Sequence, residues 1–262
     1  MESPAIAPAT ARADPSSSRL RAIGRLALLG GWFALCVVPH LLARLSGRSR
    51  WPRRFLGGVA RICGADVRVE GAAPSPGTLL IANHVSWLDI PALAGATGCA
   101  FVSKAEVRDH PLLKWIADQN ATLYVDRSDK RAIHGQAERM RAALSGGQPL
   151  AIFPEGTVGD GGRLLPFKTS LLSAVAPPPA GVVMRPVAID YHGRAGELAW
   201  VPGEPGLANF LRVLGRPGRR SVTVRVLDPL DPSGDRKVLA SAAHDRIAEA
   251  LSDAGASPRA AL

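Results

Sequence analysis

The 262-residue sequence is 47% hydrophobic and 21% charged, which indicates a folded protein with one main domain and excludes a disordered chain. Its 32 Lys and Arg against 22 Asp and Glu give a net charge of +10, which suits nucleic acid, an anionic membrane surface or an acidic substrate equally well. Cys36, Cys63 and Cys99 form no CxxC pair and no Cys/His ligand spacing, so neither a metal site nor a disulfide framework is expected.

The N-terminal quarter of the chain combines an apolar run with many arginines. Residues 1–18 are rich in Ala, Pro and Ser without periodicity, which predicts a disordered tail. Residues 26–42 (LALLGGWFALCVVPHLL) have His40 as their only polar side chain. The arginines around this run are Arg19, Arg21, Arg25, Arg44, Arg48, Arg50, Arg53, Arg54 and Arg61.

This apolar run is short for a membrane span, and Pro39 interrupts its last turn. A spanning helix usually has its Lys and Arg on one side, so arginines on both flanks favour a re-entrant or interfacial helix at the inner leaflet. A true span and a buried helix of a soluble domain are the alternatives. No small-residue cleavage site of a signal peptide follows the run. We therefore expect residues 19–62 to form a membrane-associated basic and apolar helical segment.

From residue 65 onward, short β-type runs alternate with helical patterns. Strands are predicted at 65–71, 77–84, 99–104, 121–127, 149–156, 182–192 and 221–229. Helices are predicted at about 87–96, 111–119, 129–145, 168–175 and 236–253, whereas the Pro- and Gly-rich stretches 176–180 and 201–218 are expected to be loops. This alternation predicts an α/β domain over residues 63–255, with a mainly parallel sheet flanked by helices and functional residues at the strand ends. Residues 256–262 are expected to be a tail.

The motif NHVSWLD (83–89) follows directly after the apolar strand TLLIA. Asp89 stands five positions after His84, at the start of a helix, so the two side chains can turn towards each other. A carboxylate can then hold one imidazole nitrogen as N–H and leave the other free to take a proton from an alcohol. Because the sequence contains no GxSxG elbow, His84 would activate a substrate hydroxyl directly. The alternative is that both residues only shape the turn.

Other polar residues stand at further strand ends. Glu155 in FPEGT (153–157) could accept a hydrogen bond from a substrate hydroxyl, and Gly156 permits close backbone approach. Lys104 and Arg127 end two more strands, and Arg is well suited to bidentate binding of phosphate. The alternatives are a simple turn for FPEGT and solvated surface charge for the two cations.

Taken in order, NHVSWLD, SKAEV, YVDR, FPEGT and MRPVAI resemble the motif series of the glycerolipid acyltransferase family, which includes the 1-acylglycerol-3-phosphate acyltransferases. The resemblance covers about residues 65–230, and the apolar N-terminal segment also matches the membrane-attached bacterial members. It implies that His84 is the general base, that Asp89 orients it, that Arg127 contacts an acceptor phosphate and that the Val187 region lies on the acyl-donor side. The substrate-binding residues implied are Asn83, Ser86, Lys104, Arg127, Glu155, Gly156, Thr157 and Lys168.

This resemblance implies transfer of a fatty acyl group from acyl-CoA or acyl carrier protein to the free hydroxyl of 1-acylglycerol-3-phosphate, which gives phosphatidic acid without a cofactor. Lys104 or a backbone N–H after a strand would stabilise the oxyanion. Members that act on lysophosphatidic acid commonly read FPEGTR, whereas Val158 stands in place of that Arg. The continuation GDGGRLLPFKTSLL is more similar to the lyso-ornithine-lipid acyltransferases. Acylation of lyso-ornithine lipid is therefore the alternative, and hydrolysis of a thioester or lipid ester is a remote one.

The partners expected are a lyso-lipid, an acyl donor and an anionic membrane surface. Nucleic acid is not expected, because aromatic residues make up only 5% of the sequence and show no stacking pattern among the basic residues. The basic and apolar N-terminal segment, together with the resemblance to the bacterial members, predicts attachment to the cytoplasmic face of a bacterial inner membrane.

Overall fold

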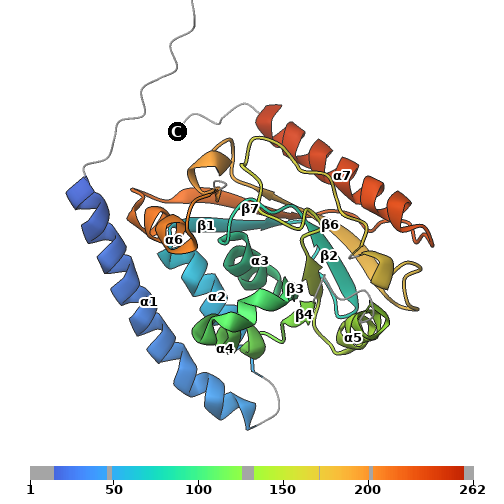
Figure 1. Ribbon diagram of the computed structural model, residues 1–262, viewed down its shortest axis with the longest axis horizontal. Coiled ribbons are helices and arrows are strands. Elements are labelled where there is room, and N and C mark those ends of the chain that lie inside the picture. The colour runs from blue at the N-terminus through green and yellow to red at the C-terminus, as the bar shows by residue number, and fades with distance from the viewer. Residues whose placement is uncertain (1–14, 46–48, 126–132, 171, 201–202, 257–262) are drawn as a thin grey trace, which may run out of the picture.

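The computed structural model describes residues 15–45, 49–125, 133–170, 172–200 and 203–256, which form a sheet with helices on both faces (Figure 1). All seven predicted strands form, because each is a short apolar or β-branched run between turn residues. They are β1 Ala65–Glu70, β2 Thr78–Ala82, β3 Ala100–Lys104, β4 Leu123–Val125, β5 Leu150–Ile152, β6 Val183–Asp190 and β7 Arg220–Val226.

The helices agree with the sequence predictions in most places. They are α1 Pro15–Arg44, α2 Trp51–Ile62, α3 Asp89–Thr97, α4 Pro111–Gln119, α5 Ile133–Ser145, α6 Gly206–Gly215 and α7 Arg236–Ala256. Short 3₁₀ turns cover Ala105–Asp109, Leu172–Ala174 and Ala195–Glu197. The helix α1 begins at Pro15, so residues 15–18 of the expected disordered tail are helical, and residues 1–14 lie outside the described part.

Two predictions in this domain were wrong. The segment 168–175 forms only the 3₁₀ turn Leu172–Ala174, because three consecutive prolines from Pro177 soon end any helical path. The expected loop at 201–218 contains α6, which starts at Gly206 and buries Val213 and Leu214. The flanking Gly and Pro residues indicated a loop, although the amphipathic stretch between them, LANFLRVL, is long enough for two helical turns.

The strand order is β1-β7-β6-β2-β5-β3-β4. Every neighbouring pair is parallel except β6 and β7, which are antiparallel. The mainly parallel sheet predicted from the sequence is thus confirmed. Since β2, β3, β5 and β6 run in the same direction, their carboxyl ends meet at one edge of the sheet, as the ends of parallel strands do in open α/β folds. The antiparallel β7 begins at that same edge.

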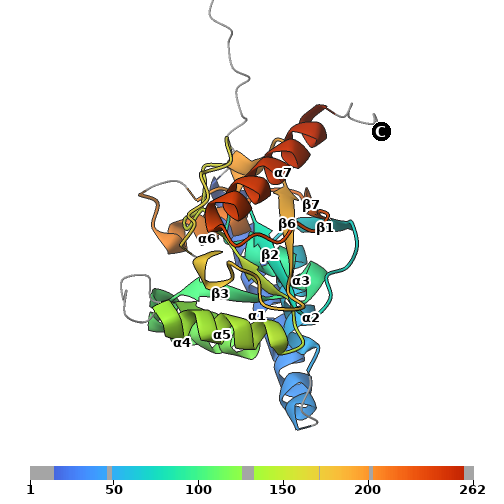
Figure 2. The same ribbon diagram turned by 90° about the vertical axis from the view of Figure 1, so that its right-hand side faces the viewer.

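The two faces of the sheet are buried by different helices. On β2, Leu80 and Ala82 face a core formed with α2 and α3, while Leu79 and Ile81 face a core formed with α5 and α7. Successive side chains of a strand point to opposite faces, so a strand buried throughout its length must be covered on both. In Figure 2, α5 and α7 lie on the side towards the viewer.

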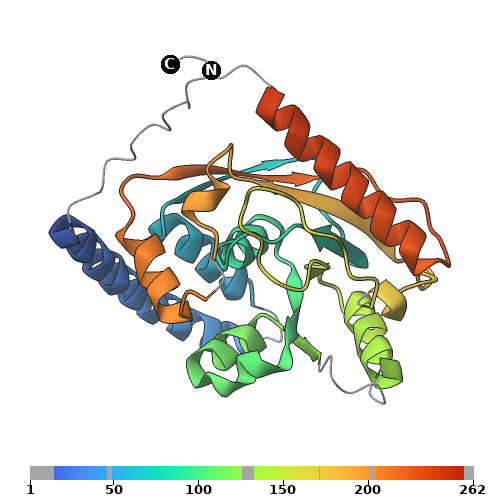
Figure 3. The ribbon, with the colours of Figure 1, turned by 45° about the horizontal axis from the view of Figure 1, so that its top comes forward.

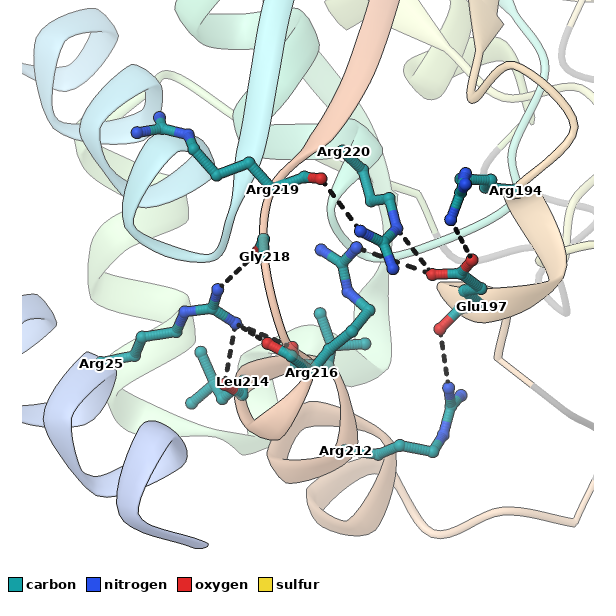
Figure 4. Close-up of polar contacts among 10 residues, drawn as sticks. Arg25, Arg194, Glu197, Arg212, Leu214, Arg216, Gly218, Arg219 and Arg220 are labelled. Carbon is teal, nitrogen blue, oxygen red and sulfur yellow. Dashed lines mark hydrogen bonds and ion pairs between the residues drawn. The ribbon is translucent and has the colours of Figure 1, made fainter. Parts of the chain in front are cut away.

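The helix α1 lies along the outside of the domain, at the opposite side from α7 (Figures 1 and 3). Arg25 donates to the carbonyl oxygen of Leu214 in the last turn of α6, at 2.8 Å, and to that of Gly218 just beyond α6, at 3.0 Å (Figure 4). Further along, Nε1 of Trp32 donates to the carbonyl of Phe55 in α2 at 3.0 Å. His40 contacts Gln119 of α4 at 2.9 Å. Polar contacts thus attach α1 to three helices of the domain along its length.

The remaining face of α1 is apolar and exposed. By length and composition, Ser18–Arg44 could cross a membrane. Between Ala22 and Ala43 the only charged residue is Arg25, whose guanidinium points to the domain. The large exposed side chains of α1 are Leu20, Ile23, Leu26, Leu28, Leu35, Val38, Leu41 and Leu42. This surface, the outer face of α1, has the character of a membrane contact.

Candidate active site

His84 and Asp89 meet at the carboxyl edge of the sheet, as the motif predicted. Nδ1 of His84 lies 2.9 Å from Oδ2 of Asp89. Asp89 is the first residue of α3 and is fully buried, whereas the His84 side chain is 15% exposed. An ionised carboxylate can only accept, so this contact assigns the proton to Nδ1 and leaves Nε2 as the free acceptor. Among the described residues, none bonds to Nε2.

The Asp89 carboxylate has four donors. The backbone N–H groups of Val85 and Ser86 donate to Oδ2 at 2.7 and 2.8 Å, alongside His84. The hydroxyl of Tyr191 donates to the other oxygen, Oδ1. Hydrogen bonds from four donors at the N-terminus of α3 hold this carboxylate in one orientation.

Glu155 fixes the backbone of His84. Its Oε1 accepts from the backbone N–H of His84 at 2.6 Å, and its Oε2 accepts from Leu165 at 3.2 Å. The carbonyl of His84 in turn accepts from the N–H of Gly159 at 2.8 Å. Burial raises the pKa of Glu155 to about 7, although both backbone donors act in the opposite direction. Glu155 thus connects the loop 156–165 to the turn that carries His84.

The imidazole of His84 also rests on an aromatic ring. Its centroid is 4.1 Å from that of Phe153, and the two planes are inclined by 17°. Phe153 in turn stacks on Phe101 of β3. With Nδ1 held by Asp89 and one ring face held by Phe153, the position of Nε2 is determined by packing as well as by hydrogen bonding.

Asn83 and Ser86 are buried and bonded to the backbone of this chain. Asn83 accepts from the N–H of Ile189 at 2.7 Å and donates to its carbonyl at 3.0 Å, which joins the end of β2 to β6. The Ser86 hydroxyl accepts from the N–H of Leu88 at 3.3 Å. These contacts shape the turn around His84, and direct contact of either side chain with a substrate stays a prediction.

The other predicted binding residues lie around the same edge. Gly156 is buried, and Thr157 next to it is exposed. Lys104 at the end of β3 and Lys168 are exposed, and the backbone N–H of Lys168 donates to the carbonyl of Pro154 at 2.8 Å. Arg127 lies outside the described residues. Over the described part of the chain, no group of three or more His, Cys, Asp or Glu side chains is placed to hold a metal ion.

Sequence reasoning missed Phe153 and Tyr191 as neighbours of the His84–Asp89 pair. Both stand just beyond strand ends, Phe153 after β5 and Tyr191 after β6, and both strands pair with β2. Only the strand order brings these two residues next to the pair, and the sequence does not give that order. Together these residues present one unprotonated imidazole nitrogen at a partly open edge of the sheet. This arrangement can take a proton from a bound hydroxyl.

Comparisons with known proteins agree with this chemistry. The model of a family described as Acyltransferase matches residues 66–190. A lyso-ornithine lipid O-acyltransferase of Pseudomonas aeruginosa is 38% identical over 252 residues, which cover 89% of this chain and 95% of that protein. A 1-acyl-sn-glycerol-3-phosphate acyltransferase of Neisseria gonorrhoeae is 31% identical over 144 residues, which cover 53% of this chain and 56% of that protein.

A solved structure shares the fold. The crystal structure of the 1-acyl-sn-glycerophosphate acyltransferase PlsC from Thermotoga maritima matches 89% of this chain and 97% of its own, with a TM-score of 0.59 and 21% sequence identity. The sheet and its flanking helices described above are therefore an architecture that is already known from experiment.

Proposed function

Because this chain belongs to the acyltransferase family and acts on a lyso-lipid and an acyl donor, we propose that it is a lyso-ornithine lipid O-acyltransferase. The observation that carries the choice of acceptor is the extent of the similarity to the Pseudomonas protein, which includes nearly all of both chains. The similarity to the Neisseria protein includes little more than half of either chain.

The loop beside His84 supports this acceptor. Val158 lies between Thr157 and Gly159, and Gly159 bonds directly to the carbonyl of His84. A valine has no donor for a phosphate, whereas an arginine at this position would offer a bidentate one. An acceptor whose head group is an amino acid does not require that donor.

In the proposed reaction, Nε2 of His84 takes the proton from the acceptor hydroxyl as its oxygen attacks the thioester carbonyl of acyl-CoA or acyl carrier protein. The C–S bond breaks as the tetrahedral intermediate collapses, and the thiolate receives the proton from His84. The new ester and the free thiol are the products, and His84 is restored. Asp89 holds the imidazole tautomer and stabilises the imidazolium between the two proton transfers.

The outer face of α1 supports attachment to a membrane surface. The contacts of α1 with α6, α2 and α4 would have to break for it to cross a bilayer as a separate helix. If α1 instead lies in the interface, its outer face is buried among lipid chains while the docked face stays on the domain. The lyso-lipid can then reach His84 from the inner leaflet, and the acyl donor can reach it from the cytoplasm.

The experiment is a measurement of thiol release from palmitoyl-CoA by membranes that contain the protein, with lyso-ornithine lipid or lysophosphatidic acid as acceptor. The His84→Ala variant provides the blank. Val158→Arg provides the comparison, because it restores the cation at the position where phosphate-acceptor relatives carry one.

We expect release that depends on lyso-ornithine lipid, and a gain of activity on lysophosphatidic acid in Val158→Arg. Release that depends only on lysophosphatidic acid in the wild type would reject the proposed acceptor. It would instead support phosphatidic acid synthesis, which the similarity to the Neisseria protein favours as the second candidate. Release without any acceptor would indicate hydrolysis.

A further inference from the structure

Tyr191 lies behind the His84–Asp89 pair, on the side away from Nε2. It follows β6 directly, and β6 is the neighbour of β2, whose end carries His84. The Tyr191 side chain is 2% exposed, and its hydroxyl donates to Oδ1 of Asp89. The two residues are 102 positions apart in the chain, so only the sheet brings them together.

This hydrogen bond has no substitute in the site. The other three donors to Asp89 all reach Oδ2. Within the described ranges, Tyr191 is the one donor to Oδ1, and a buried carboxylate oxygen without a donor is costly. Without this contact, the carboxylate would keep three donors on one oxygen and none on the other, and its orientation towards His84 would be less restricted.

The surroundings keep Tyr191 in the form that donates. Burial, and then the charge of Asp89, raise the pKa of Tyr191, which keeps the phenol protonated. The guanidinium of Arg216, which follows α6, acts in the opposite direction. On the other side of the pair, Glu155 faces His84 and Asp89 from the loop after β5. Among the described residues, these are the charged groups that act on the network.

Arg216 is itself unusual, because it is 8% exposed and its side chain makes no hydrogen bond to any described residue. Its nearest carboxylate oxygen, on Glu197, is 3.9 Å away, and Arg220 shares that carboxylate (Figure 4). Burial and the charge of Arg220 lower the pKa of Arg216 to about 10. At neutral pH a positive charge therefore remains on the Tyr191 side of the network.

We propose that Tyr191 is a positioning residue for acyl transfer, which holds Oδ1 of Asp89 so that Oδ2 stays aligned with Nδ1 of His84. This inference rests on the proposed roles of His84 and Asp89. Tyr191 does not touch the reacting atoms, and it acts through the carboxylate that orients the base.

The direction of the expected effect follows from charge distribution. A donor on Oδ1 withdraws part of the negative charge that Oδ2 directs at His84. If the donor is removed, the carboxylate attracts the imidazolium proton more strongly, so His84 becomes unprotonated only at higher pH. The acid side of the pH–rate profile should therefore move to higher pH. A stronger donor at the same position should move it to lower pH.

The experiment compares Tyr191→Phe with the wild type by initial rates of acyl transfer to the acceptor over pH 5 to 9. Tyr191→Phe keeps the ring and removes only the hydroxyl. Tyr124→Phe is the matched control, because Tyr124 is the other of the two tyrosines in the sequence and also donates to a carboxylate, that of Asp118, at 2.8 Å. Thermal unfolding of each variant measures any loss of stability separately.

We expect Tyr191→Phe to lower kcat about tenfold or more, with little change in the KM of the acceptor, and to move the acid limb upward by about half a pH unit or more. Tyr124→Phe should leave both unchanged. In the Tyr124→Phe background, replacement of Tyr191 by a fluorinated tyrosine strengthens the donor without removing it, and should move the limb in the opposite direction.

Two outcomes would overturn the inference. One is an unchanged acid limb in both Tyr191→Phe and the fluorinated protein, with only a lower unfolding temperature, since that would make Tyr191 a packing residue. The other is an equal effect of Tyr124→Phe. Failure of the proposed function itself would be recognised separately, because the wild type would then show no transfer to lyso-ornithine lipid. Failure of the role of His84 would be recognised by transfer activity that His84→Ala retains, whatever the behaviour of Tyr191.

Discussion

Replacement of two leucines on the outer face of α1 should detach the protein from membranes while leaving its fold intact. Leu28 and Leu35 are 61% and 62% exposed and lie seven residues apart, about two turns, on the same side of the helix. Full burial of a leucine side chain contributes about 2.5 kcal/mol. Burial of the exposed fraction of each leucine in lipid can therefore contribute about 1.5 kcal/mol to membrane binding, and both together about 3 kcal/mol. This corresponds to a change of about a hundredfold in the partition coefficient between vesicles and water.

The assay is flotation of purified protein with vesicles of phosphatidylethanolamine and phosphatidylglycerol, for the wild type and for Leu28→Gln/Leu35→Gln. Glutamine has a similar size and no charge, so it changes apolar area without adding electrostatic repulsion. Val238→Gln is the control, because Val238 is 54% exposed on α7, at the opposite side of the molecule. Unchanged partition of the double variant, or an equal loss in Val238→Gln, would refute the assignment of the outer face of α1 to the membrane.

Two further predictions concern the turn around His84. The pKa of Glu155 is about 7 in the folded chain, so below about pH 4.5 the carboxyl is protonated in both the folded and the unfolded chain. As pH rises from there through 7, the unfolding free energy falls by about 3 kcal/mol in all, because the unfolded chain releases this proton first. Glu155→Gln should therefore flatten the decrease in unfolding free energy between pH 4.5 and 8 in urea titrations, and a parallel dependence in both proteins would contradict this. Asn83→Ala should lower the unfolding free energy by about 2–4 kcal/mol, because both backbone groups of Ile189 lose a buried partner. A loss below about 1 kcal/mol in the same titration would be inconsistent with this.

The strands could be predicted because their signal is local. Runs such as TLLIA and SVTVRV are apolar or β-branched between turn residues, and they became β2 and β7. The helix α6 was not predicted, because Gly206 and Pro205 at its start are loop-type residues and its burial depends on contacts with α1 and the sheet. Likewise, α1 starts at Pro15, ahead of the helical segment predicted over 19–62, and it is attached to the domain by contacts such as that of Arg25, which no local pattern indicates.

The same distinction applies to the site. His84 and Asp89 are five residues apart, at a strand end and a helix start, so a local pattern indicated that the two side chains can turn towards each other. The contacts of Tyr191 with Asp89 and of Glu155 with His84 bridge distant parts of the chain, and they require β6 and β5 to be the two neighbours of β2. The local patterns of seven strands do not specify that order.

His84 is the proposed base of an acyl transfer to a lyso-lipid. The most direct measurement is the initial rate of ester formation from radiolabelled palmitoyl-CoA and lyso-ornithine lipid by purified His84→Ala, relative to the wild type in the same vesicles, after circular dichroism has shown equal folding. We predict a decrease of about 10²-fold or more, which is the usual contribution of a general base. A variant that is folded, membrane-bound and within a few-fold of the wild-type rate would contradict the account.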